Sequence, residues 1–152
     1  MQIRVHIPTQ TLDLLAPDSS LVRRYPISTS QFGTGTEPGS YRTPTGRFIV
    51  ESKWGEGAEE GEIFVARIGT GRFGLPEDSS DHVQTRILWL EGVEPHNANT
   101  HERYIYIHGT NAEHLLGTPA SHGCVRMSNA DVVDLFNRVK EGTPVWIEDF
   151  VS

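Results

Sequence analysis

Residues 121–126 read Ser-His-Gly-Cys-Val-Arg, and they contain Cys124, the single cysteine of a 152-residue chain. A second short segment, His108-Gly109-Thr110, ends a strand-like run just upstream. A histidine within hydrogen-bond reach activates a cysteine nucleophile by taking its proton, and nearby positive charge lowers the pKa of a thiol. The two segments therefore predict a reactive thiol, with a pKa below its ordinary value, rather than a cysteine that fills the core.

Length and composition are those of one globular domain, which we expect to cover residues 1–152. The formal net charge is −7 and no basic run is present, so a nucleic-acid partner is not expected. A single cysteine excludes an internal disulfide. The sequence contains no apolar run that would serve as a signal peptide or membrane span. As it stands it favours a cytoplasmic protein, or a periplasmic or envelope protein if an export signal has been removed.

Alternation of apolar and polar residues predicts a mainly β fold. Ile3, Val5 and Ile7 alternate with polar neighbours, as in a half-buried strand. Many short strands separated by turn residues predict a sandwich or a partly closed barrel. Two long loops, 32–45 and 91–102, are candidates for the binding surface. The other strands are expected at 12–14, 21–27, 47–50, 63–68, 85–90, 104–107 and 143–147.

One principal helix is expected directly after the cysteine. Ser128 can cap its start, and Asp131, three residues later, completes a pair that resembles a capping box. Gly142 and Pro144 stop it, and a weaker, shorter helix is expected at 111–116. The apolar stripe that packs this principal helix on the core is expected to consist of Val132, Leu135, Phe136 and Val139.

The residues around the cysteine can supply the other groups that an attacking thiol needs. Gly123 has no Cβ and lets a substrate approach the backbone, and the turn into the helix can present free N–H groups to an oxyanion. His108 is held at the end of a strand, and the carbonyl of Gly109 can orient its ring. Arg126 can anchor a substrate carboxylate through a bidentate contact, or it can brace the loop.

Other interpretations are weaker. A lone cysteine is often a small buried hydrophobe, but the neighbours of Cys124 are mostly polar. His108, His122 and Cys124 are ligand types that zinc accepts, but no His-Glu-x-x-His or Cys-x-x-Cys motif is present, and we expect neither a metal nor another cofactor. The glycine-rich segment 32–39 lacks the ending of a phosphate loop. The remaining histidines are expected on the surface: His6, His82, His96, His101 and His114.

Together, the segments 107–111 and 121–127 resemble the signature of the L,D-transpeptidase catalytic domain, the YkuD-like family. The resemblance extends over nearly the whole chain. Segment 43–48, Thr-Pro-Thr-Gly-Arg-Phe, is similar to the family's Thr-Pro-x-Gly-x-Phe segment, 88–92 resembles the strand before its active-site flap, and 142–147 resembles its last strand. The resemblance implies a β-sandwich of mixed sheets with one principal helix beside the active site.

The resemblance also implies chemistry on peptidoglycan stem peptides or muropeptides, at the bond between the L-centre of the third residue and the following D-alanine. It implies that Cys124 is the nucleophile, that His108 is the base and that the Gly109 carbonyl orients it. Carbapenem-type inhibitors are compatible with such a site. The groups that bind the oxyanion and the substrate are then expected at Ser121, His122, Gly123 and Arg126.

Three functions follow from this resemblance. The absence of an export signal favours a cytoplasmic L,D-carboxypeptidase that trims tetrapeptides to tripeptides during cell-wall recycling. The first alternative is an L,D-transpeptidase that crosslinks peptidoglycan in the cell envelope, and the second is a non-catalytic module that binds stem peptides. Water as the acceptor gives the carboxypeptidase and an amine gives the transpeptidase, and the shape of the loops decides between them.

Overall fold

The computed structural model describes residues 1–79 and 81–150, which are organised around a ten-stranded mixed β-sheet. The strands are β1 (Gln2–His6), β2 (Thr11–Leu15), β3 (Leu21–Pro26), β4 (Gly46–Trp54), β5 (Glu62–Val65), β6 (Ile68–Phe73), β7 (Gln84–Gly92), β8 (Tyr106–Gly109), β9 (Val125–Met127) and β10 (Pro144–Glu148). The helices are α1 (Asn129–Arg138) and the short 3-10 helices η1 (Pro95–Asn97), η2 (His101–Arg103) and η3 (Glu113–Leu115).

The sheet runs in the order β3-β2-β1-β10-β4-β7 and then divides. The β5–β6 hairpin joins β7 near its start, and β8 pairs along β7 and carries β9 on its other side. The β1–β10 and β8–β9 pairs are parallel, and the other pairs are antiparallel.

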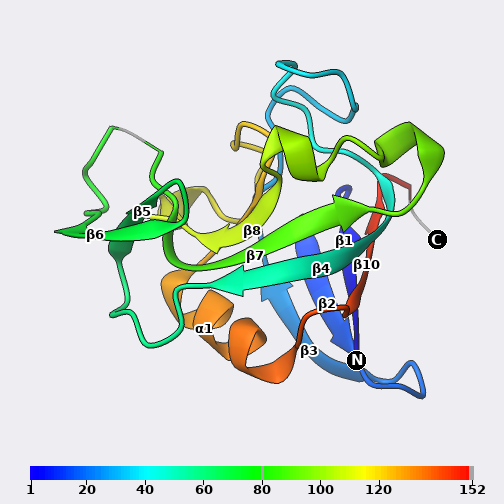
Figure 1. Cartoon of the computed structure of the whole chain (residues 1–152), viewed down its shortest axis with the longest axis horizontal. Coiled ribbons are helices and arrows are strands. Elements are labelled where there is room, and N and C mark those ends of the chain that lie inside the picture. The colour runs from blue at the N-terminus through cyan, green and yellow to red at the C-terminus, as the bar shows by residue number, and fades with distance from the viewer. Residues whose placement is uncertain (80, 151–152) are drawn as a thin grey trace.

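The sheet curls until its two ends meet. Just beyond β3, the backbones of Ser28 and Arg126 exchange two hydrogen bonds, with N···O distances of 3.0 and 2.8 Å. Figure 1 shows β1, β2 and β3 behind β4 and β7, with α1 at one end of the sheet. The predicted mainly β fold, with mixed strand directions and one principal helix, is therefore confirmed.

The main core lies inside this curled sheet. In β1 the alternating side chains of Ile3 and Val5 are fully buried, as the period-two pattern predicts. Helix α1 begins as expected, because the Oγ of Ser128 accepts a hydrogen bond from the backbone N–H of Asp131 at 3.1 Å. The predicted apolar stripe of this helix is buried in the same core: Val132, Leu135, Phe136 and Val139.

Three details of the strand prediction were wrong. The run 63–68 contains a hairpin turn instead of one strand, because Ala66 and Arg67 both adopt left-handed backbone angles, with φ of 50° and 66°. The predicted strand 104–107 begins only at Tyr106, because Tyr104 is left-handed and ends η2. Strand β9 was not predicted, because a run of three residues is too short for its alternation to indicate a strand.

Leu135→Ala is expected to lower the free energy of unfolding by about 3 kcal/mol, because it removes a fully buried side chain that attaches α1 to the core. Asn137→Ala, at an exposed position of the same helix, is the control and should change it by less than about 0.5 kcal/mol. Urea unfolding followed by circular dichroism measures both values. Equal losses in the two variants would contradict this assignment of the buried helix face.

Candidate active site

Side chains along the paired strands β8 and β9 point alternately to the two faces of the sheet. The parallel register matches Ile107 with Val125, and alternation sends these two side chains into the main core. The opposite face therefore carries His108 on β8 and Arg126 on β9, which are also register partners. Cys124 directly precedes β9, so it continues this second face. The structure thus brings together three residues that lie up to 18 positions apart in the sequence.

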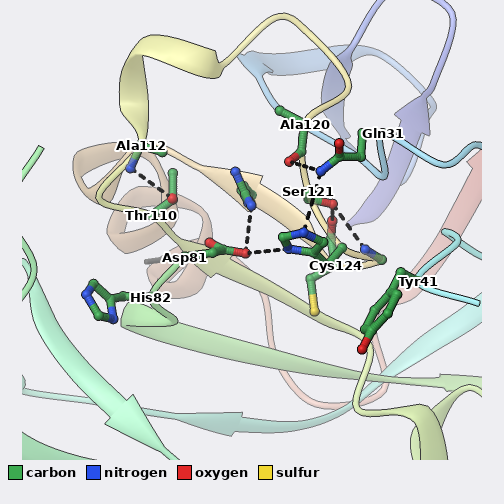
Figure 2. A network of polar contacts seen from close by, with 12 residues as sticks. Gln31, Tyr41, Asp81, His82, Thr110, Ala112, Ala120, Ser121 and Cys124 are labelled. Atoms are coloured by element: carbon green, nitrogen blue, oxygen red, sulfur yellow. Dashed lines mark hydrogen bonds and ion pairs between the residues drawn. The ribbon is translucent and has the colours of Figure 1, made fainter. Parts of the chain in front are cut away.

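Cys124 lies at the end of the turn that leads into β9. Its Sγ accepts a hydrogen bond from the backbone N–H of Tyr106 at 3.3 Å and lies 3.4 Å from the carbonyl oxygen of Tyr104. The side chain is partly exposed. Figure 2 shows the sulfur pointing out of the turn, with Asp81 on one side and Tyr41 on the other.

Burial raises the pKa of the Cys124 thiol to about 11, so the predicted lowering of this pKa was wrong. The Tyr106 N–H and the charges of Arg126 and Arg103 act in the opposite direction, but they do not offset the loss of solvent. The negative charge of Asp81 adds to the rise. The thiol is therefore protonated at neutral pH, and it needs a base in order to react.

His108, on the same face of the β8–β9 pair, is the predicted base. Its side chain is buried, and this burial lowers its pKa, so the ring is neutral at pH 7. Its Nδ1 lies 2.6 Å from the carbonyl oxygen of Gly109, which is the contact that the sequence analysis anticipated. A carbonyl only accepts hydrogen bonds, so Nδ1 carries the ring proton and Nε2 keeps a free lone pair.

Two hydrogen bonds of the Ser121 side chain fix the turn before the cysteine. The Oγ of Ser121 donates to the carbonyl oxygen of Cys124 at 2.6 Å and accepts from the backbone N–H of Gly123 at 3.3 Å. Ser121 is buried, so its hydroxyl lies inside the turn. Gly123 has a φ of 121°, which L-residues with a Cβ rarely adopt.

Thr43 is a site residue to which the sequence analysis gave no role. Its Oγ1 donates a hydrogen bond to the carbonyl oxygen of Gly123 at 3.0 Å and accepts one from the backbone N–H of Ser30 at 3.0 Å. The available signal was its place in the segment 43–48, which resembles a family motif. This segment therefore acts on the active site from a distant part of the sequence.

Asp81 is a second residue that the sequence analysis missed. Its Oδ2 lies 2.6 Å from Nη2 of Arg126 and 3.6 Å from Nδ1 of His122. Arg126 is 3% exposed, whereas the His122 side chain is 50% exposed. Figure 2 shows the Asp81 carboxylate beside the cysteine turn. No periodicity or motif marks this aspartate, which lies in the loop between β6 and β7.

His122 lies at the rim of the site, among side chains from the long loop 32–45. Its ring centroid is 6.0 Å from that of Phe32 and 5.8 Å from that of Tyr41. Gln31 Nε2 is 3.5 Å from His122 Nε2. These contacts place part of this loop beside His122, and its role as a binding surface stays a prediction. A groove extends from this rim and is lined by Pro38, Gly39, Tyr41, Glu102, Arg103, Ile105 and His122.

The other histidines lie outside this site. His96 and His114 are exposed, and His6 and His82 are partly exposed, each of these two near a carboxylate. His101 is also partly exposed, and it stacks on Trp89 at a centroid distance of 3.7 Å. Within residues 1–79 and 81–150, no group of three His, Cys, Asp or Glu side chains is placed to hold a metal ion. None of the helices in these ranges has the length and apolar character needed to cross a membrane.

A cysteine and a buried, carbonyl-held histidine on one face of a curled mixed sheet are the residue types that a cysteine-dependent acyl-transfer enzyme uses. Residues 1–147 match the profile of the L,D-transpeptidase catalytic domain, YkuD, and the chain belongs to this family. The family comprises enzymes that act on peptidoglycan.

Individual relatives agree with this assignment. The chain is 30% identical over 154 residues to the probable L,D-transpeptidase ErfK/SrfK of Escherichia coli strain K12, covering 97% of this chain and 44% of the relative. The chain spans at most 64% of the length of the curated relatives compared with it.

Solved structures share the fold. An L,D-transpeptidase from Mycobacterium smegmatis superposes with a TM-score of 0.63 at 18% identity, over 97% of this chain and 58% of that one. L,D-transpeptidase 3 from Mycobacterium tuberculosis, in complex with a faropenem-derived adduct, gives a TM-score of 0.61 at 20% identity, over 97% of this chain and 59% of that one.

The raised thiol pKa predicts an unusual pH profile for alkylation. We expect the rate at which iodoacetamide modifies Cys124 to keep rising up to pH ~11, because only the thiolate reacts and about one thiol in a thousand is ionised at pH 8. Intact-mass spectrometry measures the rate, and Cys124→Ala, which leaves no cysteine, is the blank. A plateau below pH 9 would show that the thiol is not desolvated as described.

Proposed function

We propose that Cys124 attacks the carbonyl carbon that joins the third residue of a peptidoglycan stem peptide to the following D-alanine. The contact of 2.6 Å between His108 Nδ1 and the Gly109 carbonyl carries this proposal, because it leaves Nε2 free to accept the thiol proton. A sulfur–carbon bond then forms, the carbon–nitrogen bond breaks, and the proton passes from Nε2 to the leaving amine of D-alanine. The product is a thioester on Cys124.

The two pKa values determine when the proton moves. Burial raises the pKa of the thiol and lowers that of His108, so both groups are neutral in the resting enzyme. A preformed thiolate–imidazolium pair is therefore disfavoured. Proton transfer accompanies attack on the substrate, when the charge leaves the sulfur for the carbonyl oxygen.

That oxygen is stabilised by the backbone N–H groups of Gly123 and Cys124 in this proposal. The Gly123 N–H already makes a long hydrogen bond of 3.3 Å to Ser121 Oγ, which it can exchange for a stronger one to an oxyanion. Ser121 contributes by holding the turn from inside. Arg126 and His122 border the position of the substrate and are proposed to hold it.

Hydrolysis of the thioester is the proposed outcome, which makes the protein an L,D-carboxypeptidase that converts tetrapeptides to tripeptides. Water needs no binding site of its own, and His108 can activate it as it activates the thiol. The cytoplasm stays a prediction for the compartment, and cell fractionation tests it.

Transpeptidation is a second candidate that one observation favours. The groove beside His122 offers a second stem peptide a place to bind, and Glu102 in its lining can attract the ammonium group of an acceptor. Adding an amine acceptor to the assay distinguishes the two reactions: the crosslinked dimer appears only if the groove delivers the amine faster than water arrives.

Incubation with a soluble disaccharide-tetrapeptide is expected to release D-alanine, and mass spectrometry follows it. Cys124→Ala should abolish release while changing the thermal midpoint little, because it removes only one sulfur atom from a side chain that is partly exposed. A carbapenem is expected to add its mass to the wild type only, by analogy with the LD transpeptidase LdtMt1 solved in complex with imipenem. The absence of both D-alanine release and acylation would leave a stem-peptide-binding module as the explanation.

The proposed roles predict an order of losses for two histidine variants. His108→Ala should lower kcat by about 10²–10⁴-fold, because it removes the base. His122→Ala should cost about tenfold or less and act mainly through KM, because this ring lies at the exposed rim. Steady-state kinetics of D-alanine release measure both, and the reverse order would exchange the two roles.

A further inference from the structure

Arg126 is a buried cation whose hydrogen-bonding capacity is only partly used. Its side chain is 3% exposed, and its Nη2 meets Asp81 Oδ2 at 2.6 Å. Its Nε is buried and has no hydrogen-bond partner among the described residues. A buried guanidinium N–H without a partner costs free energy, so its retention beside the nucleophile calls for an explanation.

The unpartnered Nε and the bonded Nη2 form one edge of the guanidinium group. A carboxylate that approaches this edge with both oxygens satisfies both N–H groups in the bidentate geometry that arginine favours. Asp81 does not achieve this, because its Oδ2 is the oxygen that lies near Nη2 and also the one near His122. This edge of Arg126 is therefore a carboxylate site in which Asp81 satisfies Nη2 and leaves Nε unpaired.

The two partners differ in their freedom to move. The Asp81 side chain is 27% exposed and belongs to the loop that precedes β7, so it can turn toward solvent. Arg126 is fixed in β9, which pairs with β8 and exchanges backbone hydrogen bonds with Ser28. A competing carboxylate would consequently displace Asp81, and the arginine would stay in place.

We propose that Asp81 is an internal stand-in for the substrate carboxylate: it pairs with Arg126 in the resting enzyme and is displaced by the free carboxylate of the terminal D-residue. This inference rests on the proposed function for the identity of the carboxylate. Asp81 keeps the buried arginine paired while the site is empty. An uncharged terminus cannot displace it, so the exchange selects stem peptides that end in a free carboxylate.

Displacement also links the charge near the sulfur to the progress of the reaction. The charge of Asp81 is one of the influences that raise the pKa of the Cys124 thiol. When Asp81 turns toward solvent and a carboxylate that belongs to the leaving group takes its place, the negative charge near the sulfur departs with the product D-alanine. The deacylating water or amine then meets a site that Asp81 can enter again.

Binding to the Cys124→Ala protein tests the exchange without turnover. Calorimetry compares a disaccharide-tetrapeptide with the same compound carrying a C-terminal carboxamide. Adding Asp81→Asn is expected to tighten binding of the carboxylate form about tenfold and to leave the carboxamide form unchanged. Asp81→Glu keeps the competing charge and should stay near the parent protein. A loss of affinity for both forms in Asp81→Asn would instead mean that Asp81 only holds Arg126 in shape, and the proposal would be overturned.

Asp78→Asn is the matched control on the same loop. Asp78 accepts a hydrogen bond from the Leu75 backbone and lies 3.4 Å from His82, away from Arg126. The expected result is no change in either affinity. Circular dichroism and the thermal midpoint confirm that each variant is folded before it is compared.

A second measurement needs no peptide. Iodoacetate and iodoacetamide both alkylate the Cys124 thiolate with loss of iodide, and they differ in the carboxylate that Arg126 would bind. Asp81→Asn should raise the ratio of the iodoacetate rate to the iodoacetamide rate about tenfold. A change in the thiol pKa cancels in this ratio, because both reagents react with the same thiolate. An unchanged or lowered ratio would overturn the proposal.

The two measurements separate this inference from the proposed function. Suppose that Asp81→Asn raises the ratio of the iodoacetate rate to the iodoacetamide rate but neither tetrapeptide form binds. The carboxylate site at Arg126 is then supported, and the stem peptide is rejected as its ligand. Release of D-alanine from tetrapeptide, together with no effect of Asp81→Asn on the ratio or on the binding preference, rejects the role of Asp81 and leaves the enzyme assignment intact.

Discussion

The parallel pairing of β8 with β9 is the constraint on which the active site depends. Its register sends Ile107 and Val125 into the core, and the same register therefore places His108 and Arg126 on the opposite face beside Cys124. A slip by one residue would exchange the two faces and bury the proposed catalytic groups in the core. Burial of the apolar face thus stabilises the fold and fixes the position of the chemistry at the same time.

Desolvation of the thiol is the reason that the proposed reaction needs a histidine. The sequence shows Cys124 between a histidine and an arginine, which indicated a lowered pKa for the thiol. The structure adds the side chains of Trp89 and Tyr106, whose cluster packs against the thiol, and the loss of water outweighs the charges. A protonated thiol also has a benefit: it resists indiscriminate alkylation and oxidation, because the thiolate is the reactive form.

The sequence predicted the parts of the molecule whose signals are local. The alternation in β1, the capped helix after Ser128 and the contact between His108 and its neighbour Gly109 all lie within a few residues. Strand β9 and the roles of Thr43 and Asp81 were missed for the opposite reason. Each depends on a partner far along the chain, Ile107, Gly123 and Arg126 respectively, and nothing in the local pattern reports such a contact.

Gly109 shows how tightly the carbonyl that contacts His108 is tied to the scaffold. A Cβ at this position would lie 2.7 Å from the backbone oxygen of Gln84 and 2.5 Å from Oδ1 of Asn129. The same Oδ1 accepts a hydrogen bond from Thr85 at 2.5 Å, so the start of α1 and the start of β7 meet at the glycine. The glycine is needed here for close packing, since its φ is not in the left-handed region. The start of β7 and the start of α1 both pack closely against Gly109. These two elements also pack on the core, so they hold the carbonyl that contacts His108 in place.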